Sequence, residues 1–424
     1  MHVRISHGIV LSLVAIALSP AVAGIELVAP KEGETVEQLW PDVKAFLDLP
    51  REGRQHNREK ISKKEAKLFH KHVGAKPVEF RWTGDSAGVY TLKVMRAPDG
   101  RVFVERTVTG LVAQVSGRLE VGRDWTWSVS DGKSSAEGAF KTEDRAPRIV
   151  SFEGIRNARD LGGWKGLDGR RVKQGMMLRT GGLNYNAKCV YYSYEEILDL
   201  FKQGKLAGAG VGRNAAELSR EYASKLGRGN GIDKNFLRLI KEAPKGPGEE
   251  RMTPADRDYL LNFWKMKSDL DLRGDWETFG MLFSPLGKDV NWFHCETKSG
   301  YGGIVSPVGR ACQTLNVSVL VNEKNFPVDF HCIGGTDRTG TMAYLLNGFL
   351  GVAEEDLIRD YEMSFIGGGG VDKRHYAWLT GLVKAVRELP GKTIADKVWG
   401  YYRSLGFTDE QLTELRERLL EPAK

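Results

Sequence analysis

The sequence predicts two folded parts: an all-β sandwich, followed by an α/β domain whose mostly parallel sheet is flanked by helices. Two patterns support this prediction. Between residues 76 and 145, short segments of alternating apolar and polar residues are separated by turn residues, as in small sandwiches. After residue 150, short apolar segments alternate with stretches of helical periodicity, which indicates parallel strands with helices on both faces of the sheet.

The first 23 residues have the pattern of a secretory signal peptide. Arg4 lies in a short polar start, residues 8–18 are apolar, and residues 21–23 form a small-residue cleavage site. The apolar stretch is shorter than the roughly 20 residues that span a bilayer. We therefore expect cleavage, no stable membrane insertion afterwards, and export to the periplasm or as a secreted protein. A retained N-terminal anchor is the alternative.

The composition is that of a folded globular protein, with 41% hydrophobic residues, 28% charged residues and a net charge of +7. The densest basic run, residues 58–71, has its charges at helical spacing with Leu68 and Phe69 among them. We interpret it as the solvated face of a helix within a lead-in segment, residues 24–75, and expect no nucleic-acid partner.

The predicted sandwich, residues 76–145, is of the immunoglobulin or fibronectin kind. Trp125 and Trp127 alternate along one of its strands, so we expect both in the core on the same face. Its strands are expected at residues 78–82, 89–94, 102–108, 117–121, 124–129 and 137–142.

The α/β domain is expected to extend over residues 150–424. Thr253, Pro254 and Asp256 form a clear helix start, with a capping residue, a proline and a first-turn acid. Strands are expected at residues 176–181, 268–273, 290–293 and 328–330, and later helices at residues 307–321, 354–363, 375–388, 393–405 and 409–420.

The stretch from His331 to Gly340 connects an apolar strand to a helix, and five residues separate Cys332 from Arg338. A loop of this length can wrap a tetrahedral phosphate with inward-facing N–H groups, and the helix N-terminus adds a positive dipole end. Arg338 can hold two phosphate oxygens, and Cys332 at the bottom of this positive site is expected to be a thiolate nucleophile. The phosphate-binding residues are Ile333, Gly334, Gly335, Thr336 and Arg338.

Neighbouring residues have expected supporting roles. His331 orients the loop and helps to hold the thiolate, and the Thr339 hydroxyl can hydrogen-bond the sulfur. Asp337 has two interpretations: a general acid that protonates the leaving oxygen, or a structural acceptor that tethers the loop. We favour catalysis, because an acid inside an anion site is otherwise electrostatically unfavourable. Asp275 is a rival for the acid role.

No cofactor and no metal ion are expected. The glycine spacing from Gly335 to Gly340 is that of a nucleotide-binding loop, but Thr341 stands where that loop has lysine. The pairs His294–Cys295 and His331–Cys332 lack further ligands at zinc spacing.

Residues 150–424 resemble a family of bacterial, often exported, tyrosine-protein phosphatases that use a cysteinyl-phosphate intermediate. The family's phosphate loop, His-Cys-x-x-Gly-x-Asp-Arg-Thr-Gly, is matched at residues 331–340. Four further elements match in order, at residues 157–163, 178–181 and 271–273 and in the helix that follows Leu405.

The resemblance implies a cysteine-phosphatase-like fold and a phosphorylated protein or small phosphoester as substrate. It adds Arg159, Asp160, Arg179, Asp271 and Arg273 as supporting residues, and either Arg159 or Arg179 is expected to face the phosphate pocket. Relatives pass directly from the element matched at residues 178–181 to the helix that starts here at Thr253 and Pro254, so residues 184–251 look like a helical insertion.

Three questions stay open from the sequence. Many relatives have lysine at the position of Thr336, a residue linked with activity on phosphoinositides, so its absence favours phosphoprotein over inositol phosphates or other small phosphoesters. A non-catalytic binding protein is the remaining alternative. If Cys332 stays reduced, Cys189, Cys295 and Cys312 can form one disulfide or none.

Overall fold

The computed structural model describes residues 24–54, 74–184, 251–274, 277–278, 284–297, 301–365 and 373–423. Several features expected from the sequence lie outside these residues. They are the signal peptide, the basic helix at residues 58–71, nearly all of the 184–251 segment, Asp275 and Cys189.

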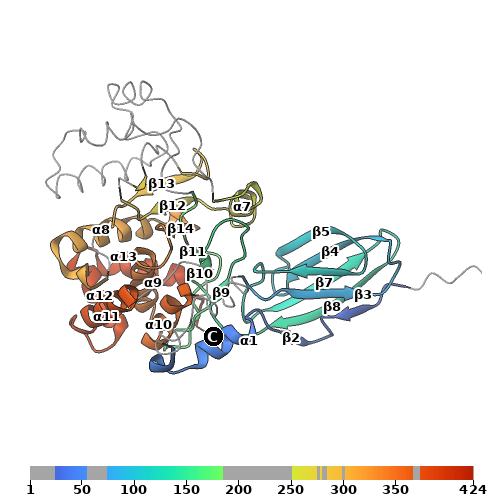
Figure 1. Ribbon diagram of the computed structural model, residues 1–424, viewed down its shortest axis with the longest axis horizontal. Helices are drawn as coiled ribbons and strands as arrows, with labels where there is room; N and C mark the ends of the chain where they lie inside the picture. Colours follow the sequence, from blue (N-terminus) through green and yellow to red (C-terminus); the bar gives the residue numbers. More distant parts are fainter. Residues whose placement is uncertain are drawn as a thin grey trace, which may run out of the picture.

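The N-terminal part of the described chain forms two sheets around one apolar core (Figure 1). One sheet has the strand order β1-β3-β6, and the other has the order β2-β8-β7-β4-β5. Trp125 and Trp127 are 0% and 1% exposed in this core, as predicted. The strands are β1 (Leu27–Ala29), β2 (Glu34–Val36), β3 (Val78–Trp82), β4 (Val89–Arg96), β5 (Val102–Thr109), β6 (Val112–Val115), β7 (Asp124–Ser130) and β8 (Ser135–Thr142).

Two details differ from the prediction. The prediction of a strand at residues 117–121 is wrong. Gly117 has a φ of +66°, which does not fit an extended strand, and a Cβ there would lie 2.3 Å from the Ser151 nitrogen. The chain turns at this point against the second part of the protein, and the strand is the earlier β6. The lead-in segment also contributes strands that were not predicted, because β1 pairs with β3 and β2 pairs with β8.

The second part is a mixed α/β structure, as predicted, built on a sheet of order β13-β12-β14-β11-β10-β9. The strands β13, β12, β14 and β11 are parallel, and β10 and β9 continue the sheet antiparallel. The strand β14 lies between β12 and β11, so its carboxyl end is central. The bounds are β9 (Arg148–Ile149), β10 (Arg159–Asp160), β11 (Met177–Thr180), β12 (Ser268–Asp271), β13 (Asn291–His294) and β14 (Val328–His331).

The expected helices are present in the described chain, with ends within a few residues of prediction. Most of them gather beside the sheet on the side away from the all-β part (Figure 1). Thr253 caps α7 in a capping box with Asp256, as predicted. The helical segments are α1 (Pro41–Asp48), α7 (Pro254–Asp258), η2 (Tyr259–Phe263), η4 (Tyr301–Val305), α8 (Pro307–Val321), η5 (Glu323–Asn325), α9 (Arg338–Phe349), α10 (Glu354–Glu362), η6 (Met363–Phe365), α11 (Lys373–Arg387), α12 (Ile394–Ser404) and α13 (Asp409–Leu419).

The two faces of the sheet differ in character. Val328 and Phe330 of β14 belong to the largest apolar core, with residues of α8 to α13. Because side chains alternate along a strand, Asp329 and His331 lie on the opposite face. Both are fully buried. This face therefore carries a polar cluster beneath the loop that follows β14.

Buried polar contacts join the two parts of the described chain. Arg148 of β9 donates to Asp160 at 2.8 Å and to the Arg118 carbonyl at 2.7 Å. The Gln174 side-chain amide bonds both the N–H and the carbonyl of Val121, at 2.9 and 3.0 Å. The helix α1 packs against residues of both parts. None of the described helices is long and apolar enough to cross a membrane.

Candidate active site

The loop from Cys332 to Asp337 connects the central strand β14 to α9, as predicted. Gly335 has a φ of +70°, a region that glycine enters without steric cost. A Cβ at Gly335 would lie 2.5 Å from the Thr180 carbonyl oxygen. The loop therefore requires glycine at this position both for its backbone angle and for its contact with β11.

Side chains from outside the loop bond its carbonyl groups. Because these carbonyls already have partners, they are fixed in direction, and the loop keeps the shape in which its N–H groups can converge on an anion. The donors are Asn157 to the Gly334 carbonyl at 2.9 Å, Arg179 to the Gly335 carbonyl at 2.7 Å, and Arg251 to the Ile333 carbonyl at 2.9 Å.

Arg179 bonds the loop from outside through the Gly335 carbonyl, whereas the hydrogen bonds of Arg159 go to Asn157, Asp360 and Ser364. Both arginines are buried, at 1% exposure for Arg159 and 0% for Arg179, and both pair with Asp360 of α10. Burial and the charge of Arg179 lower the pKa of Arg159 to about 10. Asp360 thus compensates the charge of both guanidinium groups, and the expectation that one of them faces the phosphate pocket stays a prediction.

Arg338 begins α9 and forms a bidentate pair with Glu277. Its Nη1 and Nη2 groups donate to the two carboxylate oxygens at 2.5 and 2.9 Å, and Nη1 also reaches the Leu272 carbonyl at 3.3 Å. Glu277 is 1% exposed, whereas the Arg338 side chain is 19% exposed. The buried carboxylate thus orients a guanidinium group that remains partly open to solvent.

Cys332 lies in the first position of the loop and is 2% exposed. Burial alone raises the pKa of its thiol, but the positive charge of Arg338 and hydrogen bonding from Thr339 outweigh burial, so the pKa lies below its ordinary value. Among the described residues, the buried Thr339 hydroxyl has no other hydrogen-bond partner. The Asp337 carboxylate acts in the opposite direction. The site thus favours a thiolate at Cys332.

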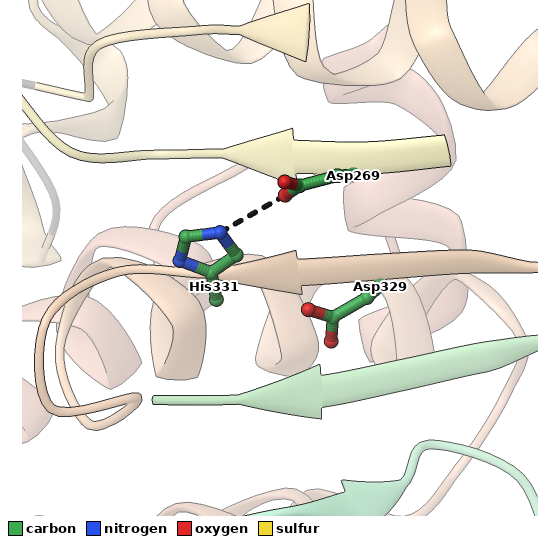
Figure 2. Close-up of side chains that lie close together, drawn as sticks. All are labelled: Asp269, Asp329 and His331. Carbon is green, nitrogen blue, oxygen red and sulfur yellow. Dashed lines mark ion pairs between the residues drawn. The ribbon is translucent and has the colours of Figure 1, made fainter. Parts of the chain in front are cut away.

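His331 points from β14 toward Asp269 on the neighbouring strand β12 (Figure 2). Its Nε2 lies 2.9 Å from an Asp269 oxygen, and its Nδ1 lies 3.2 Å from the Cys332 carbonyl oxygen. Burial lowers the pKa of His331, but the carboxylates of Asp271 and Asp269 outweigh burial and raise it to about 9. The residue that precedes the cysteine is therefore held as a cation between strand and loop.

Asp329 completes this cluster, on the β11 side of β14 (Figure 2). The Thr180 hydroxyl lies 3.1 Å from each of its oxygens. Burial raises the pKa of Asp329 to about 8, which His331 counteracts and Asp269 reinforces. Asp269, Asp329 and His331 together have a geometry that could hold a metal ion. Among the described residues, no other group of three or more histidines, cysteines or carboxylates does. The existing ion pair and hydrogen bonds already account for their positions.

Two further expected residues form a buried pair next to the loop. Arg273 donates to both oxygens of Asp271, at 2.9 Å from Nε and 2.7 Å from Nη2. Burial raises the pKa of Asp271, but the charges of Arg273 and His331 outweigh it and lower the pKa.

Asp160 bonds Arg148 and the N–H groups of Gly162 and Gly175, none of which belongs to the loop. Asp160 thus holds Arg148, which in turn bonds the Arg118 carbonyl of the all-β part.

Asp337 occupies the N-cap position of α9, but its side chain does not cap the helix. One carboxylate oxygen accepts from the Tyr361 hydroxyl at 3.1 Å, and the other lies 3.3 Å from Nε2 of His375. The rival acid Asp275 lies outside the described residues. Cys295, Cys312 and Cys332 are buried, and these three described cysteines form no disulfide with one another.

Sequence reasoning missed several residues that shape this site. They act across long separations in the chain, such as the 61 residues between Glu277 and Arg338. The available signal was weak: each is a polar residue in an apolar pattern or at the edge of one. The missed residues are Glu277, Asp360, Tyr361, His375 and Arg251.

Comparisons with known proteins agree with the resemblance seen in the motifs. A family model described as "Tyrosine phosphatase family" matches residues 150–189 and 248–421. A protein of Cupriavidus necator that bears the name "putative tyrosine-protein phosphatase" is 26% identical over 216 residues. That match covers 50% of this chain and 61% of the relative, so the chain spans less than two thirds of that protein's length. Residues 190–247, between the two matched ranges, fall inside the 184–251 segment.

Proposed function

This chain belongs to the tyrosine phosphatase family, and we propose that it hydrolyses protein phosphotyrosine through a cysteinyl-phosphate intermediate. The observation that carries the proposal is the position of Cys332. Its thiol, whose pKa is lowered, lies at the start of a loop whose carbonyls are bonded from outside, with Arg338 at the end of that loop. A nucleophile and a phosphate site are thus combined in one loop.

Binding comes first in the proposed mechanism. The N–H groups of the loop and the Arg338 guanidinium hold the phosphoryl oxygens, while Glu277 keeps that guanidinium in one orientation. The N-terminus of α9 adds the positive end of its dipole. These groups stabilise the negative charge that the phosphoryl group carries throughout the reaction.

The chemical steps transfer the phosphoryl group twice. The Cys332 sulfur forms a bond to phosphorus as the bond to the leaving oxygen breaks, and Asp337 gives its proton to that oxygen. A water oxygen then attacks the phosphorus, the S–P bond breaks, and the water proton passes to Asp337. His331 and Thr339 favour the thiolate that each turnover restores. No metal ion takes part in these steps.

Substrate class and location are part of the proposal. Thr336 stands where relatives with activity on phosphoinositides have lysine, which favours phosphoprotein over inositol phosphates. The N-terminal signal pattern supports export to the periplasm or the medium. The all-β part, residues 76–145, is proposed to be a fibronectin-like or immunoglobulin-like sandwich that accompanies the catalytic domain.

The test is hydrolysis of p-nitrophenyl phosphate in the presence of a chelator, with Cys332→Ser as the variant. We expect turnover in the wild type, none in the variant, and retained binding of orthovanadate by both. Cys295→Ser is the matched control, because burial raises the pKa of that thiol and it should remain active. Full activity of Cys332→Ser would disprove the mechanism. Comparison of phosphotyrosine peptides, phosphoserine peptides and inositol phosphates then tests the substrate class.

A further inference from the structure

The helix α10 has polar contacts on two opposite sides. Glu355, Arg359 and Glu362 follow one another at helical spacing, and all three bond residues of the lead-in segment, which precedes the all-β part. Asp360 and Tyr361 lie on the other side of the helix and bond residues in or next to the loop between β14 and α9. The helix α10 therefore connects the lead-in segment to this loop.

Arg54 holds both ends of α10 from the lead-in segment. Its guanidinium group donates to Glu355 in the first turn of the helix at 2.7 Å and to Glu362 in the last turn. It also donates to the Leu49 carbonyl at 2.6 Å, which ties the same group to its own segment. The side chains of Arg54 and Glu362 are both 0% exposed. One buried side chain thus fastens the lead-in segment to the helix.

The opposite side of α10 supports the loop. Asp360 pairs with the buried Arg179, which in turn donates to the Gly335 carbonyl at 2.7 Å. Tyr361 donates to Asp337, at the end of the loop, at 3.1 Å. The contact through Asp360 is the stronger of the two, because it joins two charged groups that are buried. A shift of the last turn of α10 would therefore be transmitted to the loop through Asp360.

Loss of Arg54 would release this last turn. Among the described residues, Arg54 is the hydrogen-bond partner of Glu362, whose second carboxylate oxygen is buried without one. Burial raises the pKa of Glu362, and the pairing with Arg54 opposes that rise. A buried carboxylate that loses its cation takes a proton or moves toward water, and either change frees the helix from the lead-in segment.

We propose that Arg54 is a positioning residue of the active site, which fixes the shape of the phosphate-binding loop through Asp360 of α10. This inference rests on the proposed function. It makes residues 41–54 a working part of the catalytic domain, although they precede the all-β part in the chain. The family match begins at residue 150, so this contribution lies outside the matched ranges.

The experiment measures the dissociation constant of orthovanadate by titration calorimetry in the full-length protein. We expect Arg54→Met to bind vanadate about tenfold more weakly, the scale of one hydrogen bond to a charged group. The variant should also melt at a lower temperature, because a buried carboxylate has lost its partner. Binding is therefore measured well below the melting temperature of every variant, where a purely stabilising role of Arg54 would leave it unchanged.

The matched control is Arg123→Met. Arg123 also bonds two carboxylates, Glu120 at 3.0 Å and Glu421 at 3.3 Å, and these contacts likewise join segments distant in the chain. Neither partner belongs to α10. We therefore expect Arg123→Met to lower the melting temperature and to leave vanadate binding unchanged.

A second background tests the route through α10. Asp360→Asn removes the charge that ties Arg179 to the helix, so in this background Arg54→Met should weaken vanadate binding less than about twofold. If either change unfolds the protein, the milder changes Arg54→Lys and Arg179→Lys replace them in the same comparison. Smaller shifts in the same direction are then expected.

Three results in the variants would overturn the inference. Unchanged vanadate binding in Arg54→Met would mean that α10 keeps its place without this arginine. Equal weakening with and without the Asp360 charge would mean that Arg54 acts by another route, and equal weakening in Arg123→Met would mean a general loosening of the fold. Wild-type protein that binds no vanadate would overturn the proposed function together with this inference, whereas binding without hydrolysis of phosphotyrosine peptides would overturn only the proposed function.

Discussion

Removing the charge of Glu277 is the perturbation that most sharply tests how the phosphate-binding arginine is held. In the structure this buried carboxylate accepts from Nη1 and Nη2 of Arg338 and from the Gly274 N–H at 2.5 Å. Glu277→Gln keeps the shape of the side chain. It replaces one acceptor oxygen by an amide nitrogen, so that a donor faces a donor.

The size of the effect follows from these contacts. A hydrogen bond to a charged group contributes about 1.5–3 kcal/mol, and each 1.4 kcal/mol corresponds to about a factor of ten. The upper end is reduced here, because the Arg338 side chain is 19% exposed and water can replace part of the lost interaction. We therefore expect kcat/KM to fall about 10- to 50-fold for Glu277→Gln.

Steady-state hydrolysis of p-nitrophenyl phosphate and inhibition by vanadate provide the assay. The control is Glu417→Gln, because Glu417 also accepts from an arginine, Arg170, at 2.8 and 3.0 Å, but in an exposed pair. That variant should retain wild-type kcat/KM. Tighter vanadate binding by Glu277→Gln would refute the reasoning, since it would make Glu277 a competitor for Arg338 that hinders phosphate binding.

Two further predictions concern the loop and the cluster beneath it. Gly335→Ala should lose both activity and stability, by at least about 1 kcal/mol in urea unfolding, because φ is +70° and the added Cβ meets Thr180; retained activity would show that the loop adapts. His331 and Asp329 have folded-state pKa values near 9 and 8, above their ordinary values of 6.5 and 3.8. Both groups keep a proton in the folded state that the unfolded chain releases. The free energy of unfolding should therefore fall as pH rises from 6.5 to 9. The variant Asp329→Asn should show a smaller fall over the same pH range. An unchanged pH dependence in Asp329→Asn would contradict the raised pKa of this carboxyl.

Local patterns predicted the centre of the site well. The strand before Cys332, the glycine at 335 and the helix from Arg338 all follow from adjacent residues, because apolar periodicity and backbone requirements act over a few positions. The mixed α/β character of the second part was predictable for the same reason. The short strands of the lead-in segment were not: β1 has three residues and ends next to Pro30, too few to show alternation.

The surroundings of the loop could not be predicted, because they depend on contacts between distant segments. The motifs suggested that Arg159 or Arg179 lies near the loop, but they did not indicate that both pair with Asp360, which lies 181 residues beyond Arg179. The partners of Asp337 are likewise on α10 and α11. The order of strands and helices along the chain predicts that the strand ends lie at one edge of the sheet. It does not predict which partner each side chain contacts there.

The central claim is that Cys332 carries the phosphoryl group during turnover. Rapid acid quenching during hydrolysis of a phosphotyrosine peptide, followed by proteolysis and mass spectrometry of the peptide that contains Cys332, tests it most directly. We expect the mass of one phosphoryl group on Cys332 in the wild type and none in Cys332→Ser. A phosphoryl group found on another residue, or turnover without any labelled Cys332 peptide, would contradict the claim.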